Sequence, residues 1–206
     1  MKRLLDIVIS STALLLLAPL LLLVGFAVRL DSPGPALFRQ QRVGRHGRPF
    51  EILKFRSMRV AADGLQITVG GDRRITAVGA VLRRTKLDEL PQLLNVLRGE
   101  MSLVGPRPEV ARYVALYPAD ARMEVLSVRP GITDEAAIEF RDEEPLLARA
   151  SDPERAYAEQ ILPRKIDLYL RYVRCNSVAG DLRILWRTAR AILGRSGGLG
   201  GRGPGG

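Results

Sequence analysis

Residues 85–97 read TKLDELPQLLNVL, two adjacent carboxylates followed by an apolar run that contains a proline. Pro91 indicates where a helix begins, because a residue without an N–H group is tolerated only in the first helical turn. We therefore expect Asp88 at or beside the N-cap, where the helix dipole and free N–H groups favour an ionised carboxylate and also bind phosphate. The stretch is typical of an anion site, although a cap residue followed by Glu89 as a first-turn acid would give the same pattern.

The 206-residue chain carries a net charge of +10, and 47% of its residues are apolar. This charge indicates an anionic partner, which could be nucleic acid, anionic lipid or a phosphorylated substrate. The length and apolar content suffice for one globular domain with an appendage. Cys175 and His46 are the only residues of their types, which excludes an internal disulfide and cysteine-rich or histidine-rich metal sites.

Residues 7–28 form an uncharged stretch. One straight helix of that length would measure about 33 Å, enough to cross a bilayer core of about 30 Å. Pro19 lies in the middle and predicts a kink, which leaves two halves that are each too short to span. Basic residues flank both ends, and the positive-inside rule favours a re-entrant hairpin that returns to the same face. A kinked spanning helix stays open, and a cleaved signal peptide fits less well because the apolar stretch is too long.

After the membrane segment, residues 37–43 and 50–56 predict two short strands joined by a turn at 44–49, which gives a β-hairpin. Lys54 and Arg56 share one face of the second strand. Cations spaced in this way can clamp a phosphate, and they can equally well be solvated.

A loop is expected at 61–72, and apolar residues at helical spacing predict a helix over 73–84. This helix would bring Arg83 to the same corner as Asp88. The helix that follows Asp88 should end at Arg98, because Gly99 is the expected residue after a helix C-terminus.

Arg107 lies between Pro106 and Pro108. The two prolines fix the backbone and reduce the entropy that the arginine loses when it binds a ligand. Such a loop is a better clamp for phosphate or carboxylate than an arginine on a surface helix. Residues 128–133, which contain Arg129, are predicted to form a second loop of the same kind.

Near the C-terminus, Asp152 and Pro163 predict two helix starts, and Ser177 predicts the cap of a last helix. That helix carries Trp186 and other apolar residues on one side and arginines on the other. This pattern suits the plane of lipid head groups, although packing against the protein's own core would give the same pattern. The glycine-rich tail at 195–206 is predicted to be disordered.

The order of motifs in this chain resembles the monotopic phosphoglycosyl transferases, also called the bacterial sugar transferase family. The resemblance rests on the apolar segment with its central proline and on four motifs that follow it, and it runs to about Leu193. These motifs are KFRSM at 54–58, LDELPQ at 87–92, SLVGPRP at 102–108 and RPGIT at 129–133.

The resemblance implies an α+β fold with three parts. A re-entrant, proline-broken membrane helix would occupy residues 1–30, and a disordered tail would occupy 195–206. Between them, residues 31–194 would form a mostly helical catalytic domain with a small β-hairpin and an interfacial amphipathic helix. The expected location is the cytoplasmic face of the bacterial inner membrane.

The implied activity moves a phospho-sugar from a UDP-sugar to polyprenyl (undecaprenyl) phosphate and releases UMP, which initiates exopolysaccharide, O-antigen or capsule synthesis. In the family the first residue of the Asp-Glu pair is the nucleophile, so Asp88 is assigned that role, assisted by Mg²⁺ near Asp88 and Glu89. Carboxylate attack on phosphorus gives an acyl-phosphate intermediate and ping-pong kinetics. A lipid phosphate is already anionic, so Glu89 is expected to position the metal or Asp88 and not to abstract a proton.

The positions that match the family's active site carry the cations expected to bind substrate: Lys54, Arg83, Arg107, Arg129 and Arg141. Arg56 joins them because it shares a strand face with Lys54. Two departures stand out. Ala18 precedes the membrane residue Pro19 where the family often has serine, which puts the sharpness of the hairpin in doubt. After Thr133 the chain reads DEAAIEFR at 134–141 in place of Gly-Trp-Ala-Gln, which leaves the sugar open.

Two other classes of protein fit less of the sequence. A membrane-tethered nucleic-acid binder would explain the charge, but aromatic residues are only 5% of the chain, too few for base stacking. A membrane scaffold gives no reason for Arg107 between prolines or for an acidic pair at a helix start. The expected partners are therefore a UDP-sugar, polyprenyl phosphate and membrane lipid, with no nucleic acid, and a homodimer is left open.

Overall fold

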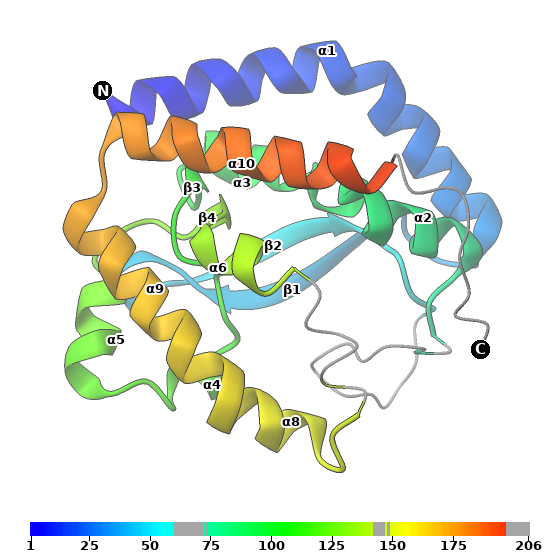
Figure 1. Ribbon diagram of the computed structural model, residues 1–206. Coiled ribbons are helices and arrows are strands. Elements are labelled where there is room, and N and C mark those ends of the chain that lie inside the picture. Colours follow the sequence, from blue (N-terminus) through cyan, green and yellow to red (C-terminus); the bar gives the residue numbers. More distant parts are fainter. Residues whose placement is uncertain (60–71, 73, 142–146, 148, 197–206) are drawn as a thin grey trace, which may run out of the picture.

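The computed structural model describes residues 1–59, 72, 74–141, 147 and 149–196. Figure 1 shows helices around a β-hairpin, with a long N-terminal helix across one side. The predicted α+β class, mostly helical with a small hairpin, is confirmed. The loop predicted at 61–72 lies outside the described residues except for its last residue, and so does the tail from 197 onwards.

The elements are α1 (Lys2–Asp31), β1 (Leu37–Val43), η1 (Arg45–Gly47), β2 (Pro49–Phe55), α2 (Ala77–Thr85), η2 (Leu87–Glu89), α3 (Gln92–Arg98), β3 (Ser102–Val104), α4 (Ala111–Val114), α5 (Ala119–Val125), β4 (Gly131–Thr133), α6 (Glu135–Glu139), α8 (Pro153–Ala156), η3 (Tyr157–Ile161), α9 (Leu162–Cys175) and α10 (Val178–Ser196).

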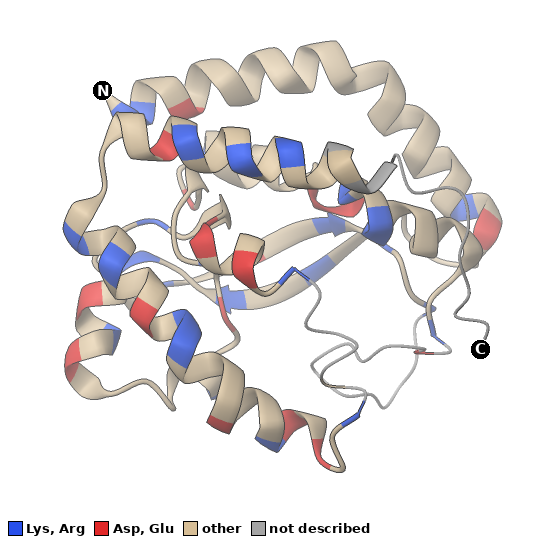
Figure 2. Ribbon diagram, viewed as in Figure 1, with Lys and Arg blue, Asp and Glu red and all other residues tan. Residues whose placement is uncertain are grey.

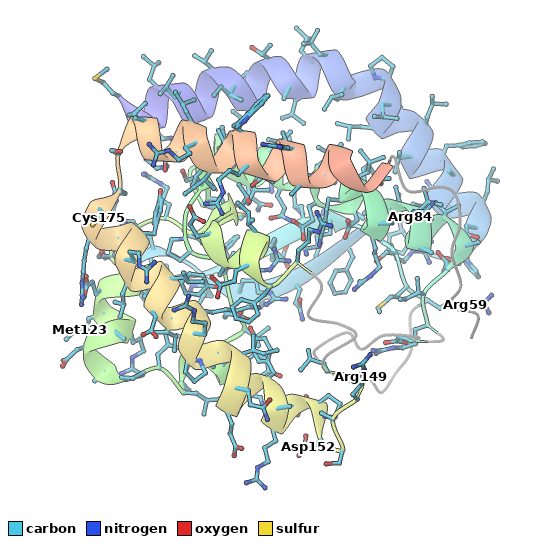
Figure 3. The ribbon with its side chains drawn as sticks, in the orientation of Figure 1. Arg59, Arg84, Met123, Arg149, Asp152 and Cys175 are labelled. Carbon is cyan, nitrogen blue, oxygen red and sulfur yellow. The ribbon has the colours of Figure 1, made fainter. Side chains whose placement is uncertain are left out.

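Among the described residues, α1 is the one helix whose length and composition would allow it to cross a membrane. Only 11% of its most apolar window is buried inside the protein. Many side chains along its middle project away from the other elements (Figure 3), while Ala13 and Leu14 pack against an apolar cluster of the domain. Pro19 lies inside the helix, where it removes a backbone hydrogen bond and causes a kink. Figure 1 shows α1 bending part-way along. The two predicted halves are therefore one continuous, bent helix.

Both ends of α1 dock on the same domain. At its start, Lys2 Nζ donates to the backbone of β3 over 3.0 Å, and Arg3 Nη1 donates to the backbone of α3 over 2.6 Å. At its end, the Asp31 carboxylate accepts a hydrogen bond from the backbone of α2 over 3.0 Å. The guanidinium of Arg56 also donates to carbonyls there, with Nη2 2.7 Å from that of Ser32. Figure 2 shows the charged residues of α1 only near its two ends.

The β1–β2 hairpin is fastened to α3 by one buried amide. The strands pair antiparallel, within one residue of the predicted bounds. The Asn95 side chain, with 0% exposure, accepts from the Leu53 N–H over 3.0 Å and donates to the Glu51 carbonyl over 2.7 Å. Asn95 thus places β2, which carries Lys54, against the helix that follows the Asp-Glu pair.

Replacing Asn95 by alanine is expected to lower the free energy of unfolding by about 2–4 kcal/mol, because the buried Leu53 N–H and the part-buried Glu51 carbonyl of β2 lose their partner. The measurement is denaturant unfolding of the detergent-solubilised protein. Asn176→Ala is the matched control, since Asn176 is exposed and donates only to a carbonyl within its own helix end. Equal stability of the two variants would show that Asn95 does not fasten the hairpin.

A second, parallel sheet joins β3, for which the sequence predicted no element, to β4, which lies within the loop predicted at 128–133. Strand β3 pairs with β4 so that Ser102 lies opposite Gly131. The backbone of Gly131 also lies very close to that of Gly105, just after β3: a Cβ atom on Gly131 would lie 2.1 Å from the nitrogen of Gly105. Only glycine permits this approach. The prediction of a loop at 128–133 is therefore wrong for its last three residues, because such a short strand depends on a tertiary contact and not on a local pattern.

Three of the predicted helix starts, at Asp152, Pro163 and Ser177, are confirmed. Asp152 and Ser177 each accept a backbone hydrogen bond, over 3.0 and 3.1 Å, at the starts of α8 and α10, and Pro163 lies in the first turn of α9. Helix α2 begins later than residue 73, at Ala77, with Thr76 as its cap. Helix α9 packs against α5 and α6, and α10 shares an apolar cluster with α1 and β3.

Candidate active site

The Asp-Glu pair lies on the 3₁₀ turn η2, between α2 and α3. Lys86 connects α2 to this turn with a φ of 59°, in the left-handed region that favours glycine. Pro91 is the N-cap of α3, whose first residue is Gln92. The prediction of a helix that begins at Asp88 is therefore wrong by one turn, because the chain reverses at Lys86 and makes a separate, tighter turn first.

Glu89 is held by two cations from different parts of the chain. Its Oε1 accepts from Lys54 Nζ over 2.9 Å and from Arg107 Nη2 over 2.8 Å. Burial alone would raise the pKa of Glu89, but Arg107 and Lys54 outweigh it and hold that pKa well below its usual range. Glu89 therefore stays ionised and ties β2 and the loop after β3 to the Asp-Glu turn.

The pKa values of the two cations, Arg107 and Lys54, are shifted in opposite directions. Glu89 raises the pKa of Arg107 well above its usual value, against the effect of burial. For Lys54 burial dominates and lowers the pKa, although Glu89 opposes it. The Lys54 side chain is only 18% exposed. The cluster is thus a desolvated group of charges in which Arg107 is the firmly ionised cation.

Asp88 differs from Glu89 in its surroundings. It is 6% exposed, and its Oδ1 atom has no hydrogen-bond partner among the described residues. Burial raises the pKa of Asp88 above its usual value, with Lys54 opposing the shift and Glu89 adding to it. The sequence predicted the opposite, a carboxylate favoured by a helix N-terminus, and the difference arises because desolvation is the largest effect. An unpaired carboxylate oxygen can bind a cation or attack an electrophile, although Oδ1 is buried in this structure and a ligand has to reach it first.

Two further cations act on the pair from the end of α2. Both Arg83 and Lys86 work to lower the pKa of Asp88, against the larger effect of burial. Arg83 therefore lies near the pair, as the sequence predicts. Lys86 is an exposed residue that sequence reasoning did not choose. The signal that could have found it is a lysine at the position after a helix end, where glycine is preferred.

Three predicted cations bind elsewhere. Arg56 donates to carbonyls at the end of α1, Arg129 Nε donates to the Gly99 carbonyl over 2.8 Å, and Arg141 Nη1 donates to the Ala191 carbonyl over 2.6 Å. The carbonyls of Ser32 and Gly99 lie at the C-terminal ends of α1 and α3, where the dipole favours a cation, and Ala191 lies inside α10. In the described part of the chain, the cations gathered around the acidic pair are Lys54, Arg83, Lys86 and Arg107.

The acidic pair offers a partial fit for Mg²⁺. No group of three or more His, Cys, Asp or Glu side chains suited to a metal ion occurs among the described residues. Mg²⁺ is nevertheless often held by one or two carboxylates together with waters and substrate phosphates. The orphaned Oδ1 atom of Asp88 suits this arrangement, whereas Glu89 already accepts from two cations.

A buried polar layer lies behind Arg107. Glu109 accepts from the Tyr157 hydroxyl over 2.6 Å, and Lys165 Nζ is 3.5 Å from that hydroxyl. Asp134, with 1% exposure, caps α6 by accepting from a backbone N–H over 2.5 Å, and it helps to raise the pKa of Arg107. Sequence reasoning noted Asp134 only as the first residue of the segment 134–141, which departs from the family. Its position just before a short helix was the signal that could have found it.

Burial raises the pKa of Asp134 to about 6. Because this folded-state pKa exceeds the unfolded value, the contribution of Asp134 to the free energy of unfolding is greatest below about pH 4 and falls by about 3 kcal/mol as the pH rises past 6. Asp134→Asn keeps the capping oxygen and is expected to remove this pH dependence of unfolding. Asp152→Asn is the control, because Asp152 is an exposed cap of the same kind. Equal slopes in wild type and Asp134→Asn would contradict the assignment.

The geometry is that of a site for phosphoryl groups beside an apolar helix. Cations from β2, α2 and the Pro-Arg-Pro loop surround two carboxylates, one paired and one with a free oxygen. Clustered cations stabilise the charge that develops when a phosphoryl group is transferred. The class that the fold and site define is therefore a membrane-associated transferase of phosphorylated groups.

Comparisons with known proteins agree with this class. The family model described as bacterial sugar transferase matches residues 1–195. The UDP-glucose:undecaprenyl-phosphate glucose-1-phosphate transferase of Caulobacter vibrioides is 41% identical over 93% of this chain and 69% of its own length. The exopolysaccharide production protein PSS of Rhizobium leguminosarum bv. phaseoli is 41% identical over 97% of this chain and 98% of its own length. The UDP-N-acetylgalactosamine-undecaprenyl-phosphate N-acetylgalactosaminephosphotransferase of Aeromonas hydrophila is 38% identical over 93% of this chain.

This chain belongs to the bacterial sugar transferase family. The chain spans the Rhizobium relative almost completely but only 43% of the Aeromonas one. The family model covers this chain from α1 into α10 and includes the whole acidic and cationic cluster.

Proposed function

We propose that this protein transfers a sugar phosphate from a UDP-sugar to polyprenyl phosphate, with undecaprenyl phosphate as the expected acceptor, and releases UMP. The product would initiate a bacterial polysaccharide. The single observation that carries the proposal is the buried Asp88 with its unpartnered oxygen beside Glu89, Lys54 and Arg107. The names of the Caulobacter and Aeromonas relatives, which act on two different UDP-sugars, support the reaction class.

The first step uses Asp88 as the nucleophile. A carboxylate oxygen of Asp88 attacks the phosphorus that bears the sugar, and the bond from that phosphorus to the bridging oxygen breaks. UMP leaves with the bonding electrons, and an aspartyl phospho-sugar remains on the enzyme. The raised pKa of Asp88 means that this step slows as the pH falls through that value, because the protonated form does not attack.

In the second step the lipid phosphate attacks the same phosphorus and the bond to Asp88 breaks, which restores the carboxylate. The acceptor is already anionic, so no general base is required, and the two half-reactions give ping-pong kinetics. Arg107 and Lys54 neutralise charge on the transferred group, and Glu89 orients both cations through its Oε1 atom.

Mg²⁺ is proposed as the cofactor. When bound, it would neutralise the diphosphate of the UDP-sugar and the leaving UMP. Asp88 would be its first protein ligand and Glu89 the second, since Asp88 has the oxygen without a partner.

We propose that α1 enters the membrane and returns, with the site at the cytoplasmic face of the inner membrane. A straight span would carry its two ends about 30 Å apart to opposite sides of the bilayer, whereas Lys2 and Asp31 both bind one domain. The bend at Pro19 must form without a preceding serine, since Ala18 has no hydroxyl to replace the lost hydrogen bond. The test is labelling with a reagent that does not cross the membrane, applied to an N-terminal tag and to the cysteine of Arg29→Cys. If α1 is re-entrant, both sites are labelled from the same side of the membrane as Cys175.

Helix α10 is proposed to lie in the plane of the lipid head groups. Leu182 and Trp186 lie one turn apart and are 52% and 69% exposed, and Figure 2 shows basic residues along the same helix. Trp186 is the only tryptophan, so its fluorescence reports on this helix alone. Quenching by brominated lipid is expected, and unchanged emission would place α10 away from the bilayer.

The test of the function is UMP release by the full chain with Mg²⁺, undecaprenyl phosphate and a panel of UDP-sugars. One or more sugars are expected to give UMP together with a lipid-linked diphosphate product, and the panel identifies the sugar. UMP release without lipid product would indicate hydrolysis, and no UMP with any sugar would remove the proposed activity.

A further inference from the structure

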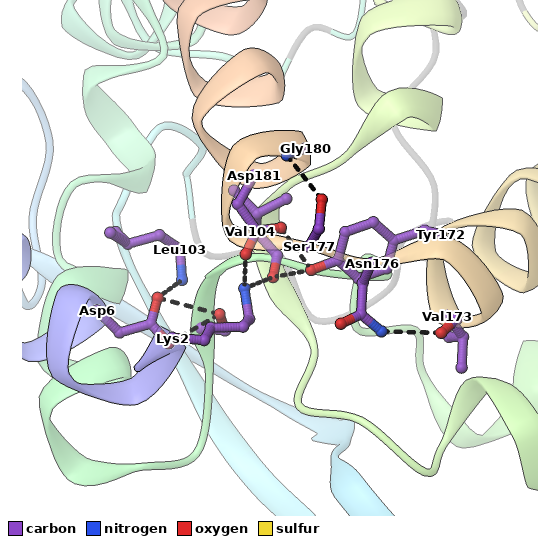
Figure 4. A network of polar contacts seen from close by, with 11 residues as sticks. Lys2, Asp6, Leu103, Val104, Tyr172, Val173, Asn176, Ser177, Gly180 and Asp181 are labelled. Atoms are coloured by element: carbon purple, nitrogen blue, oxygen red, sulfur yellow. Dashed lines mark hydrogen bonds and ion pairs between the residues drawn. The ribbon is translucent and has the colours of Figure 1, made fainter.

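The first two turns of α1 send three charged side chains into the domain, and each one ends on an element beside the candidate active site. Lys2 and Asp6 reach β3, and Arg3 reaches the last turn of α3. Figure 4 shows the part of this network around β3. A helix that served only as a lipid anchor would need no such contacts, so their role requires a separate explanation.

Asp6 lies along the edge of β3 that does not face β4. The Ser102 N–H donates to the carbonyl of Pro130, the residue just before β4, over 2.8 Å. The next N–H along the strand, that of Leu103, donates to Asp6 Oδ1 over 3.1 Å. Successive N–H groups of a strand point to opposite edges. The Asp6 carboxylate, which is 4% exposed and also accepts from the Ser102 hydroxyl over 2.9 Å, therefore takes the place of a third strand.

Lys2 holds the other end of the same strand. Its Nζ donates to the Val104 carbonyl over 3.0 Å and pairs with Asp181 of α10 over 2.5 Å. The Tyr172 hydroxyl of α9 is 3.0 Å from the same carbonyl and 2.8 Å from Asp181. Helices α1, α9 and α10 thus meet at the last residue of β3, which fixes where the following loop begins.

The elements held in this way lead directly to the two groups that pair in the site. Arg107 is three residues after β3, and Glu89 is three residues before α3. Arg3 donates to the carbonyls of Val96 and Leu97 in α3 over 2.6 and 3.1 Å. We propose that Asp6, with Lys2 and Arg3, is a positioning residue of the transferase: the first two turns of the membrane helix set where Arg107 meets Glu89.

This inference rests on the proposed function and adds a role for α1 beyond holding the protein at the bilayer. The distance of 2.8 Å between Arg107 and Glu89 depends on β3 and α3 being held at a fixed separation. A shift of the Arg107 loop by about 1 Å, after loss of the Asp6 contacts, is enough to lower a rate about 100-fold.

The test compares two substitutions of Asp6 in the full chain. Asp6→Asn keeps an acceptor for the Leu103 N–H and is expected to stay near the wild-type rate. Asp6→Leu has a similar size but no acceptor, and its kcat is expected to fall about 100-fold. The KM for the UDP-sugar should stay within about threefold of wild type, because the lost interaction acts in the transition state. Leucine does not weaken membrane binding, and Ser10→Ala, on the same buried side of α1, is the unaffected control.

A double variant separates positioning from general damage. If Asp6 acts through Arg107, the variant with both Asp6→Leu and Arg107→Ala should be no slower than Arg107→Ala alone. In the double variant the guanidinium that Asp6 positions is already absent, so loss of the Asp6 contacts has no further effect on the rate. Effects that multiply would show that Asp6 acts independently of Arg107 and would overturn the proposal.

Hydrogen exchange gives a readout that does not need activity. The amide of Leu103 should exchange faster in Asp6→Leu than in Asp6→Asn or wild type. Equal exchange rates of the Leu103 amide in all three proteins would show that Asp6 does not hold β3, whatever the activity shows. If wild type itself releases no UMP, the proposed function fails, and faster exchange in Asp6→Leu alone still supports the clamp. Wild-type rates in Asp6→Leu would overturn the inference and leave the function intact.

Discussion

Replacement of Asp88 by Asn is expected to lower kcat for sugar phosphate transfer at least about 10⁴-fold, since it removes the group to which the phospho-sugar is bonded. The amide has the shape of the carboxylate but lacks its negative oxygen, so the fold should be retained. Loss of a buried carboxylate whose pKa is raised by burial should also leave the protein at least as stable at neutral pH. The measurement is UMP release with the sugar that the panel identifies.

Asp120→Asn is the matched control for this substitution. Asp120 is an exposed acid in α5, and its loss should leave kcat within about twofold of wild type, as is usual for a surface residue away from the site. If Asp88→Asn kept more than a small fraction of the wild-type rate, with the protein free of contaminating enzyme, Asp88 would not be the nucleophile.

Replacement of Arg107 by Met is expected to lower kcat about 10²- to 10³-fold, the usual effect of removing one group that stabilises transition-state charge. Arg107 is the cation whose pKa Glu89 raises well above its usual value, so it stays charged throughout the cycle. Its loss also leaves Glu89 with Lys54 as its hydrogen-bonded cation and is expected to raise the pKa of Glu89. Arg107→Lys should recover only part of the rate, because lysine lacks the planar guanidinium.

Arg112→Met serves as the control for Arg107. Arg112 pairs with Glu154 on the surface, and its side chain is 57% exposed, so the rate should not change. A wild-type rate in Arg107→Met would mean that the Pro-Arg-Pro loop supports Glu89 but contributes nothing to transfer. A rise in KM for the UDP-sugar with an unchanged kcat would instead show that Arg107 binds the ground state and the transition state equally.

The elements that could be predicted from the sequence are those with local signals. The hairpin follows from two short strand-forming runs around a glycine-containing turn, and the starts of α8 and α10 follow from Asp152 and Ser177. The sheet of β3 and β4 has no such signal, because each strand has three residues and depends on the contact between Gly105 and Gly131.

The candidate site was predicted in part. The motifs identify Lys54, Arg83 and Arg107 as cations of the site, and the structure brings them to the acidic pair. Sequence alone does not show which acceptor an arginine reaches. Arg56 and Arg129 have the same chemistry as Arg107, yet they bind carbonyls at helix ends.

The environment of Asp88 was also not predictable from local sequence. A helix start suggests an ionised, well-solvated carboxylate, but the packing around η2 leaves Asp88 6% exposed. That burial depends on elements far away in the chain, including the hairpin that carries Lys54 and the Pro-Arg-Pro loop. A pattern in thirteen residues cannot contain this information.

The most direct test of the proposed covalent mechanism is to trap the intermediate on Asp88. The full chain is incubated with Mg²⁺ and its UDP-sugar but without lipid acceptor, reduced with borohydride and digested with trypsin, and the peptide 87–98 is sequenced by mass spectrometry. An acyl phosphate at Asp88 would be reduced to homoserine. If the mechanism is covalent, this conversion is expected at Asp88 only in the presence of the UDP-sugar. An unmodified peptide from a preparation that releases UMP and forms lipid product would contradict the covalent mechanism and favour direct transfer to the lipid phosphate.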